Sequence, residues 1–338
     1  MTHTVSFTKN AANIFFHILT RCNLNCRHCY INPDQHGKNT LPYETIEKWL
    51  TTFIAAGKEA NVVFLGGEPS LHPDLSLCIK KARALGYRSV TVDTNGYLFN
   101  DILTKVTPQE VDYFSFSLDG ATEEMNDRIR GTGSYRQCLA GIRQAVSKGF
   151  KASLIYTVSR GNIAELEKMP SLLKELSIDR FFIQVIGIRG KAADPSLEKM
   201  QIGRDEWIRI VPLVARKASA LGITATYPKV YLSPGEPFEC AGRVADNYFI
   251  FPNGRVYRCP LCEDFSVHSL MFADDRLTPT DKINECDLFQ LDIPEGCVMN
   301  KIIQPDNLSY HKDGSPAYKI ACCLLKEEIK KTVTASSF

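Results

Sequence analysis

Apolar and polar positions along the chain follow two periods. Short apolar runs rich in β-branched and aromatic residues recur, and amphipathic stretches with an apolar residue every three or four positions lie between them. The predicted strands are residues 13–19, 61–65, 89–93, 112–118, 152–158 and 181–187. The clearest predicted helices are residues 43–58, 74–86 and 163–176. Strands that alternate with helices in this way predict a parallel sheet with right-handed crossovers.

The pattern changes in the second half of the chain. Periodicity is lost over residues 188–203 and a helical pattern resumes over 206–221. Beyond residue 228, two strand-like runs flank Pro252, Asn253 and Gly254, which predicts a hairpin. This region is rich in loops and cysteines, so metal ligation is expected to stabilise it. We therefore expect three parts, namely a barrel domain at 1–227, a small cysteine-rich domain at 228–325 and a C-terminal tail at 326–338.

Composition and charge exclude several classes of protein. With 338 residues, 44% of them apolar and 23% charged, the chain can bury a substantial core. The formal net charge is +2 and the basic residues are scattered among acidic ones, so nucleic acid is not an expected partner. No apolar run is long enough to cross a membrane and no signal peptide is visible, so we expect a cytoplasmic protein with no membrane partner.

Cysteine is the outlier of the composition. The chain has twelve cysteines, and ten of them fall in two groups, one near the start and one in the last hundred residues. In a reducing compartment, clustered cysteines bind metal or perform redox chemistry more often than they form disulfides. The distribution therefore predicts two metal sites. Cys78 and Cys138 lie inside helical patterns and are predicted to be buried structural thiols.

Unusual loops follow the first four predicted strands. The segment TRCNLNCRHCY (20–30) follows the first, GGEP (66–69) the second, DTNG (93–96) the third and SLDG (117–120) the fourth. Because chemistry in parallel α/β folds collects at the carboxyl ends of the strands, these four loops are expected to meet on one face.

The first loop carries Cys22, Cys26 and Cys29 with the spacing CxxxCxxC. Zinc is one alternative, with His28 as the fourth ligand, but His28 directly adjoins Cys29, which makes one tetrahedron awkward to close. A 4Fe-4S cluster is the interpretation we favour, because three thiolates hold three irons and leave the fourth iron open to an external ligand.

The three-cysteine loop followed by Tyr30, together with GGEP and with SLDG followed by NDRIRG, resembles the radical S-adenosylmethionine (radical SAM) superfamily over roughly residues 13–190. The resemblance implies an α/β fold, a partial (β/α)6 TIM-like barrel. It also implies that the open iron binds SAM, that one electron cleaves SAM, and that the resulting 5'-deoxyadenosyl radical abstracts hydrogen from a substrate carbon.

The same resemblance implies the residues that hold the cofactors. In the superfamily the GGEP motif contacts the SAM amino group through backbone carbonyls and its carboxylate, and a serine and an arginine hold the ribose and carboxylate. Asp119 is expected to order its loop. The metal ligands are Cys22, Cys26 and Cys29, and the cofactor-binding residues are Tyr30, Gly66, Gly67, Glu68, Asn95, Ser117 and Arg130.

The C-terminal cysteines resemble a SPASM or twitch auxiliary-cluster domain. Cys240 is followed by thirteen residues, Gly254, four residues and Cys259, and the predicted hairpin makes the two cysteines neighbours. Cys262 adds a CxxC knuckle. Cys297 is predicted as the fourth ligand of an auxiliary 4Fe-4S cluster, and zinc remains an alternative because CxxC suits either metal. The alternatives to Cys297 are Cys286, Cys322 and Cys323.

These patterns predict an enzyme that modifies a small metabolite, reduced by a partner such as flavodoxin or ferredoxin. One alternative is a maturase of peptides or proteins, and another is a non-catalytic zinc or iron-sulfur protein. Peptide-maturing relatives often carry a leader-binding domain before the barrel, whereas twenty-one residues precede Cys22 here, which favours a metabolite. Basic residues after the sixth strand are candidates for an anionic substrate, and the acidic pair after Cys262 for a base, with solvation as the simpler expectation for both sets. They are Arg189, Lys191, Arg204, Glu263 and Asp264.

Overall fold

A long, curved sheet organises the molecule in this computed structural model, which describes residues 2–7, 9–54, 57–196 and 199–331. The strand order is β1-β15-β8-β7-β6-β5-β4-β3-β2-β10-β11-β12-β13. All six predicted strands are present and pair in parallel along the sheet in chain order. They are β2 (Ala11–Leu19), β3 (Glu59–Gly66), β4 (Ser89–Thr94), β5 (Tyr113–Ser117), β6 (Ala152–Val158) and β7 (Arg180–Val185).

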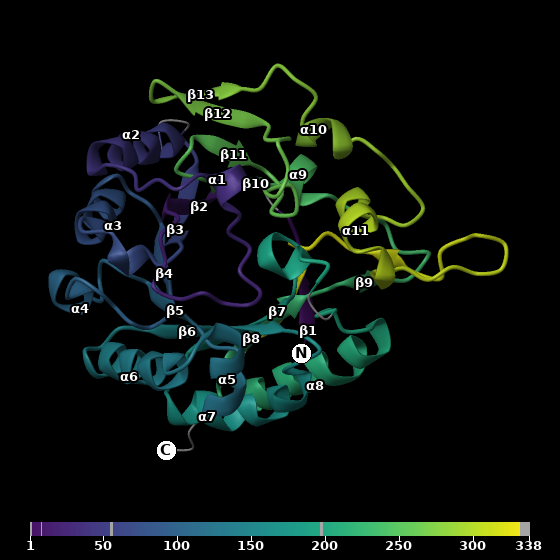
Figure 1. The fold of residues 1–338 in the computed structure, drawn as a ribbon, viewed down its shortest axis with the longest axis horizontal. Coiled ribbons are helices and arrows are strands. Elements are labelled where there is room, and N and C mark those ends of the chain that lie inside the picture. Colours follow the sequence, from purple (N-terminus) through teal and green to yellow (C-terminus); the bar gives the residue numbers. More distant parts are fainter. Residues whose placement is uncertain (1, 8, 55–56, 197–198, 332–338) are drawn as a thin grey trace.

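Helices cover the outer side of the row of strands, as Figure 1 shows. Helix α2 illustrates the packing: Ile46, Trp49, Leu50 and Phe53 are buried at helical spacing and join the main core. The other helices of this half are α1 (Pro33–His36), α3 (Leu75–Ala84), α4 (Ile102–Lys105), α5 (Glu123–Arg130), α6 (Ser134–Ser147), α7 (Met169–Glu175) and α8 (Arg204–Ala220), with α2 at Tyr43–Ile54 and 3-10 turns η1 (Pro69–Leu71), η2 (Ile163–Lys168) and η3 (Gly190–Ala193).

The sheet continues beyond the six predicted strands at both sides. Strand β8 (Thr224–Pro228) adds in parallel to β7, and β10 (Asp246–Ile250) adds in parallel to β2. The predicted hairpin is present: β10 turns into β11 (Arg255–Tyr257), and Gly254 has a φ of 86° in the turn. Strands β12 (Leu270–Ala273) and β13 (Arg276–Pro279) complete that edge.

The main core crosses residue 228. Ile250, Val256 and Phe272 belong to the same buried cluster as the barrel helices, and Phe272 stacks on Trp49 with ring centroids 4.2 Å apart. A smaller core surrounds the C-terminal cysteines, with Phe251, Tyr257 and other buried residues. The two predicted domains therefore share a sheet and a core, and the division at residue 228 stays a prediction.

The prediction of a tail from residue 326 is wrong for its first part. Residues Lys326–Ile329 form β15, which pairs with the barrel strand β8 on one side and with β1 (Thr2–Val5) on the other. The sequence KEEI carries no apolar alternation, which explains why the pattern missed this strand. The predicted frayed residues 332–338 lie outside the described residues.

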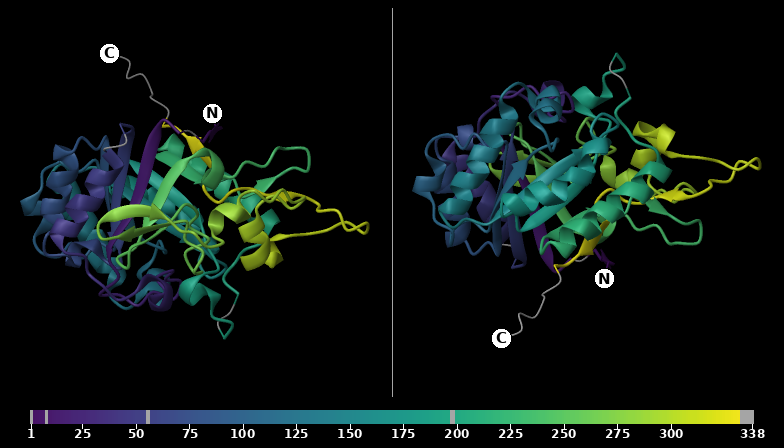
Figure 2. Two further views of the ribbon diagram at one scale, coloured as in Figure 1. Left: turned by 90° about the horizontal axis from the view of Figure 1, so that it is seen from above. Right: turned by 90° about the horizontal axis from the view of Figure 1, so that it is seen from below.

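The remaining C-terminal elements are short. Figure 2 shows a slender arm extending from this part of the molecule, closed by a bridge between Tyr310 and Pro316. No helix among the described residues is long and apolar enough to cross a membrane. The elements are β9 (Tyr231–Leu232), α9 (Ala241–Val244), α10 (Glu285–Leu288), α11 (Val298–Ile303), η4 (Pro305–Asn307) and β14 (Lys319–Ile320).

Candidate active site and cysteine clusters

The four loops after β2, β3, β4 and β5 meet at one cavity of about 450 Å³. As expected from the parallel sheet, the carboxyl ends of the strands supply its wall. All of the residues predicted to bind the first cluster and SAM line it. These are Cys22, Cys26, Cys29, Tyr30, Gly66, Gly67, Glu68, Asn95, Ser117 and Arg130.

The three thiols of the first loop are half-buried. Burial raises the pKa of Cys22 to about 11, and burial also raises the pKa of Cys26. Iron-sulfur ligands must be thiolates, so a bound cation has to stabilise them here. No other cysteine lines this cavity among the described residues. Three thiols without a fourth fit a cluster with one open iron.

The GGEP loop presses directly against the cysteine loop. The Gly67 amide donates to Leu19 O at 3.1 Å, and the Glu68 amide donates to Arg21 O at 3.0 Å. A Cβ added to Gly67 would lie 2.2 Å from Arg21 O, and Gly66 has a φ of 155°. Glycine is therefore required by close backbone approach at both positions.

Gly67→Ala is expected to lower stability by about 1–3 kcal/mol, because the new methyl group displaces the cysteine-loop backbone. The displaced loop should also bind less iron. Thermal unfolding and iron analysis measure both effects. Gly203→Ala is the matched control, since nothing lies within 4 Å of a Cβ there. Equal behaviour of the two variants would show that the contact at Gly67 has no role.

Glu68 connects three loops through hydrogen bonds. Its carboxylate is fully buried and accepts hydrogen bonds from the Ser70 amide and hydroxyl, from the Thr94 hydroxyl at 2.8 Å and from the Asn95 amide at 2.7 Å. Asn95 in turn donates to Asn23 Oδ1 at 2.8 Å. Burial raises the pKa of Glu68, and these donors oppose that shift. The carboxylate therefore positions the Asn95 side chain and the cysteine loop, in addition to the role predicted for it toward SAM.

Asp119 is the electrostatic centre of the SLDG loop. Its Oδ2 lies 2.6 Å from His28 Nε2 and 2.6 Å from Arg130 Nε, and its Oδ1 accepts from the Thr157 amide at 2.8 Å. Burial alone would raise the pKa of Asp119, but Arg130 and His28 lower it to about 2. Asp119 orders its loop as predicted. His28, named above as the fourth ligand of the zinc alternative, ties the cysteine loop to Asp119.

The loop after β7 links the two cysteine regions. The Gly190 amide donates to Asp264 Oδ2 at 2.7 Å, and the Lys191 amide donates to Cys29 O at 2.9 Å. The Arg189 guanidinium pairs with Glu263 and lies over the Tyr30 ring, 4.6 Å from its centroid. The expectation of simple solvation is therefore wrong for Arg189, Glu263 and Asp264. Arg189 pairs with Glu263 and Gly190 with Asp264, and the residues of each pair are 74 positions apart in the sequence.

Tyr30 is also held by a buried histidine. His17 Nε2 lies 2.7 Å from the Tyr30 hydroxyl, and His17 Nδ1 lies 2.9 Å from Ile250 O. Burial lowers the pKa of His17, so the ring is neutral. A carbonyl can only accept, so Nδ1 carries the proton and Nε2 accepts from Tyr30. The aromatic residue after the third cysteine is thus fixed from both sides, by His17 and Arg189.

A second cavity of about 310 Å³, called the inner chamber below, adjoins the first. The two share lining residues that include Tyr30, Asp93 and Arg189. Burial raises the pKa of Asp93 to about 7. The chamber is walled on its other side by C-terminal residues that include Cys323 and Lys326. Its size is at the lower end of the range for small-molecule sites.

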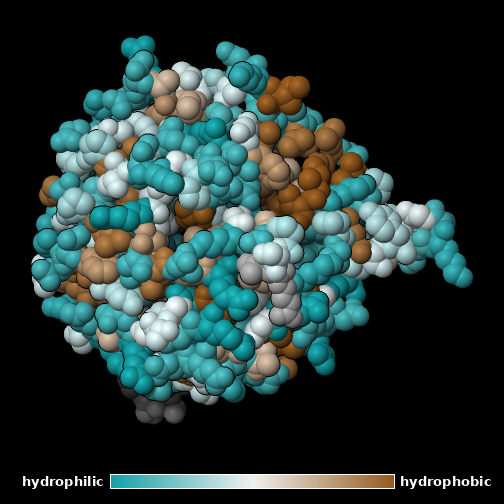
Figure 3. Space-filling view, in the orientation of Figure 1, coloured by the Kyte–Doolittle hydropathy of each residue, from teal (hydrophilic) through white to brown (hydrophobic). Residues whose placement is uncertain are grey.

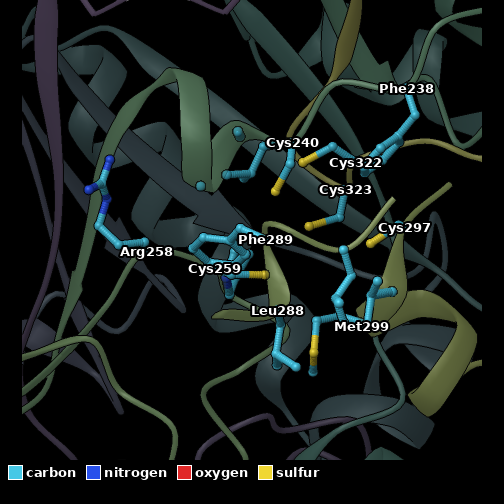
Figure 4. A pocket seen from close by; sticks show the side chains of 16 residues that line it. Phe238, Cys240, Arg258, Cys259, Leu288, Phe289, Cys297, Met299, Cys322 and Cys323 are labelled. Carbon is cyan, nitrogen blue, oxygen red and sulfur yellow. The ribbon is translucent and has the colours of Figure 1, made fainter. Parts of the chain in front are cut away.

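The C-terminal cysteines converge on a third, smaller pocket. Figure 4 shows the sulfur atoms of five cysteines around it, from four separate segments of the chain. The Cys259 thiol forms hydrogen bonds with Cys262 and Cys323, which lower the pKa of Cys259. The five are Cys240, Cys259, Cys297, Cys322 and Cys323.

The structure thus gathers the predicted ligands Cys240, Cys259 and Cys297 around one pocket, together with the adjacent pair Cys322 and Cys323. Cys262 does not line the pocket but is hydrogen-bonded to Cys259. The remaining alternative for the fourth ligand, Cys286, does not line the pocket. Among the described residues, no three or more His, Cys, Asp or Glu side chains lie in positions that could hold one metal ion. Cys78 and Cys138 are 0% and 1% exposed, which confirms the prediction of buried thiols.

Apolar side chains gather on the surface outside this pocket. Figure 3 shows them over the region of α9 and α10. Leu291 is 51% exposed, and Leu288 and Phe289 line the pocket beneath. The wall between the cysteines and the surface is therefore thin and apolar on this side.

The family model of the radical SAM superfamily matches residues 16–192, more than half of the chain. The chain belongs to the radical SAM superfamily. Its members are enzymes, so the non-catalytic alternative is wrong. The family implies a 4Fe-4S cluster and SAM as cofactors, and the cysteine-rich C-terminal region fits a SPASM or twitch domain.

Two curated relatives and a solved structure are similar to this radical SAM chain. It is 32% identical over 185 residues to the pre-heme d1 synthase of Dinoroseobacter shibae, covering 53% of this chain and 44% of that protein. It is 32% identical over 206 residues to the Fe-coproporphyrin III synthase of Methanosarcina barkeri, covering 58% and 51%. The chain spans about half the length of the curated relatives it matches.

Streptococcus suis SuiB bound to S-adenosylmethionine has a similar fold, with a TM-score of 0.63 at 15% identity, over 89% of this chain and 67% of SuiB. This likeness and the parallel sheet confirm the predicted fold class, a partial TIM-like barrel.

Proposed function

We propose that this radical SAM enzyme abstracts hydrogen from a small metabolite held in the inner chamber, with an auxiliary 4Fe-4S cluster bound by the C-terminal cysteines. The observation that carries the proposal is the adjacency of three cavities. Cys29 and Tyr30 line the first cavity, called the SAM cavity below, Tyr30 also lines the inner chamber, and Cys323 lines both the chamber and the C-terminal pocket.

The proposed holders of the first cluster are Cys22, Cys26 and Cys29. With cluster and SAM bound, this site supplies a 5'-deoxyadenosyl radical that removes hydrogen from an unactivated carbon. The chain's own residues are proposed to bind SAM and to shield the site from water. Backbone carbonyls of Gly66 and Gly67 are proposed to contact the SAM amino group together with the Glu68 carboxylate, which four protein hydrogen bonds hold in place. Asn95, Ser117 and Arg130 are proposed to hold the rest of SAM.

Tyr30 separates the SAM cavity from the chamber. His17 and Arg189 fix its ring, so the substrate side of the site has one rigid wall. A rigid, water-poor wall is what radical chemistry needs, since stray hydrogen donors would quench the radical.

The auxiliary cluster is proposed to take four of six cysteines. Cys240, Cys259, Cys262 and Cys297 are the predicted set. Cys322 and Cys323 lie close enough to replace members of it, because the Cys323 thiol is hydrogen-bonded to both Cys259 and Cys322. The position next to the chamber supports a role in accepting an electron from the substrate or in binding it. Flavodoxin or ferredoxin is the proposed reducing partner.

Two observations favour a metabolite over a peptide. The inner chamber is small and enclosed by protein on the C-terminal side. The two curated relatives are named for syntheses of pre-heme d1 and Fe-coproporphyrin III, which are small molecules. A peptide substrate is the second candidate, because SuiB was solved with its precursor peptide SuiA.

Deuterium transfer tests the proposal. The reconstituted enzyme is incubated with SAM, a reductant and either the small-molecule or the peptide fraction of cells grown on deuterated medium. Deuterium is expected in 5'-deoxyadenosine with the small-molecule fraction. Deuterium that appears only with the peptide fraction would instead establish a maturase.

A further inference from the structure

Lys326 stands apart from the other charged groups of the inner chamber. It lies at the start of β15, paired with Pro228 at the carboxyl end of β8, and it lines the chamber but not the SAM cavity. Its Nζ lies 4.7 Å from the centroid of the Phe182 ring. Among the residues that the structure describes, Lys326 forms no ion pair.

The other cation of the chamber is already neutralised. Arg189 pairs with Glu263, and the Glu263 side chain is 2% exposed. Asp93 interacts electrostatically with Lys326 without reaching ion-pair distance. Burial lowers the pKa of Lys326, because an enclosed ammonium group loses its hydration and no counter-charge lies at ion-pair distance.

Besides Asp93, Glu263 and Cys323, apolar and neutral groups make up most of the chamber wall. Phe182 lies beneath the ammonium, and Phe15 stacks on Phe249 with ring centroids 4.6 Å apart. Asn300 and Asn307 add carboxamides from α11 and η4. Such a wall suits a ligand with an apolar body that carries one charged end.

We propose that Lys326 binds a carboxylate of the substrate, at the part of the inner chamber away from the SAM cavity. This inference rests on the proposed function and names the substrate class, a small carboxylic acid with an apolar body. A carboxylate fits better than a phosphate because Lys326 is a single cation and the nearby polar groups are acidic or neutral. Anchoring the carboxylate there points the other end of the substrate toward Tyr30 and SAM.

Propionate is the probe, because it has a carboxylate and a short apolar chain. The apparent Tm of the reconstituted holoenzyme is measured with propionate, with the neutral propionamide and with phosphate, all at equal ionic strength. Propionate is expected to raise the Tm of the wild type by roughly 1–3 °C, and propionamide is not. A larger rise with phosphate would overturn the assignment of a carboxylate.

Lys326→Met removes the charge and keeps a similar side-chain length. Without ligand, its Tm is expected to rise by roughly 2–4 °C, because an enclosed unpaired cation is gone, and its response to propionate should be lost. Lys330→Met, exposed on the same segment, is the matched control and should respond like the wild type. If Lys326→Met does not fold, Lys326→Gln replaces it. A propionate response that survives loss of the charge overturns the inference.

Release of 5'-deoxyadenosine by the reduced wild type, measured in the same preparation, reports on the proposed function separately. If SAM is cleaved and propionate has no effect, only the inference at Lys326 fails. If propionate binds and SAM is not cleaved, only the proposed function fails.

Discussion

Asp119→Asn is expected to destabilise the protein by about 3–5 kcal/mol and to impair binding of the first cluster, because it leaves the Arg130 guanidinium buried without a counter-charge. Asp119 is fully buried and pairs with both Arg130 and His28. Losing it should release the cysteine loop from the SLDG loop. Chemical denaturation and iron analysis measure the two effects.

The matched control for Asp119 is Glu123→Gln, which removes an exposed ion pair with Arg136 on the neighbouring helix. That pair should contribute less than about 1 kcal/mol. A loss in Asp119→Asn no larger than in the control would contradict the account of Asp119.

Asp119 also predicts a dependence of stability on pH. Its folded pKa is lowered to about 2, so its contribution is fully present above its unfolded pKa, near 4, and is lost as the pH falls toward 2. Asp119→Asn should lack this part of the acid denaturation curve. Urea midpoints measured across that range in both proteins test the sign.

Replacing Cys259 is expected to reduce bound iron from about eight to about four atoms per chain, because Cys259 contacts Cys262 and Cys323 at the centre of the C-terminal pocket. Iron and acid-labile sulfide analysis after anaerobic reconstitution measures the change. Cys286→Ala is the matched control, since Cys286 does not line that pocket, and it should keep the iron of the wild type. Equal iron in both variants would contradict the assignment of Cys259 as a cluster ligand.

Much of the fold follows from local patterns. The six strands β2 to β7 were predictable because each is a β-branched or aromatic run between amphipathic helices, and the hairpin because Pro252, Asn253 and Gly254 mark a turn. Strand β15 was not, because its residues KEEI are mostly polar and it forms by pairing with β8 and β1, which are distant in the sequence. Pairing with strands that are distant in the sequence leaves no periodic pattern of apolar residues within the segment itself.

The candidate site divides in the same way. Ten residues that line the SAM cavity were predicted, nine of them because they lie at or just after the carboxyl end of a strand. The tenth, Arg130, ends helix α5 and was predicted only from the family resemblance. The ion pairs that hold these loops were not, since His28 and Asp119 are 91 residues apart and Arg189 and Glu263 are 74 apart. Lys326 gave no signal either, because a lysine in a polar segment is ordinarily solvated.

The central claim is that Cys22, Cys26 and Cys29 hold a cluster that cleaves SAM. The most direct test is the release of 5'-deoxyadenosine from SAM by the anaerobically reconstituted and reduced protein, compared with a variant in which these three cysteines are alanine. We predict release by the wild type, and none by the variant even though it keeps about four irons at the C-terminal cysteines. No release by an iron-replete wild type, or equal release by the variant, would contradict the claim.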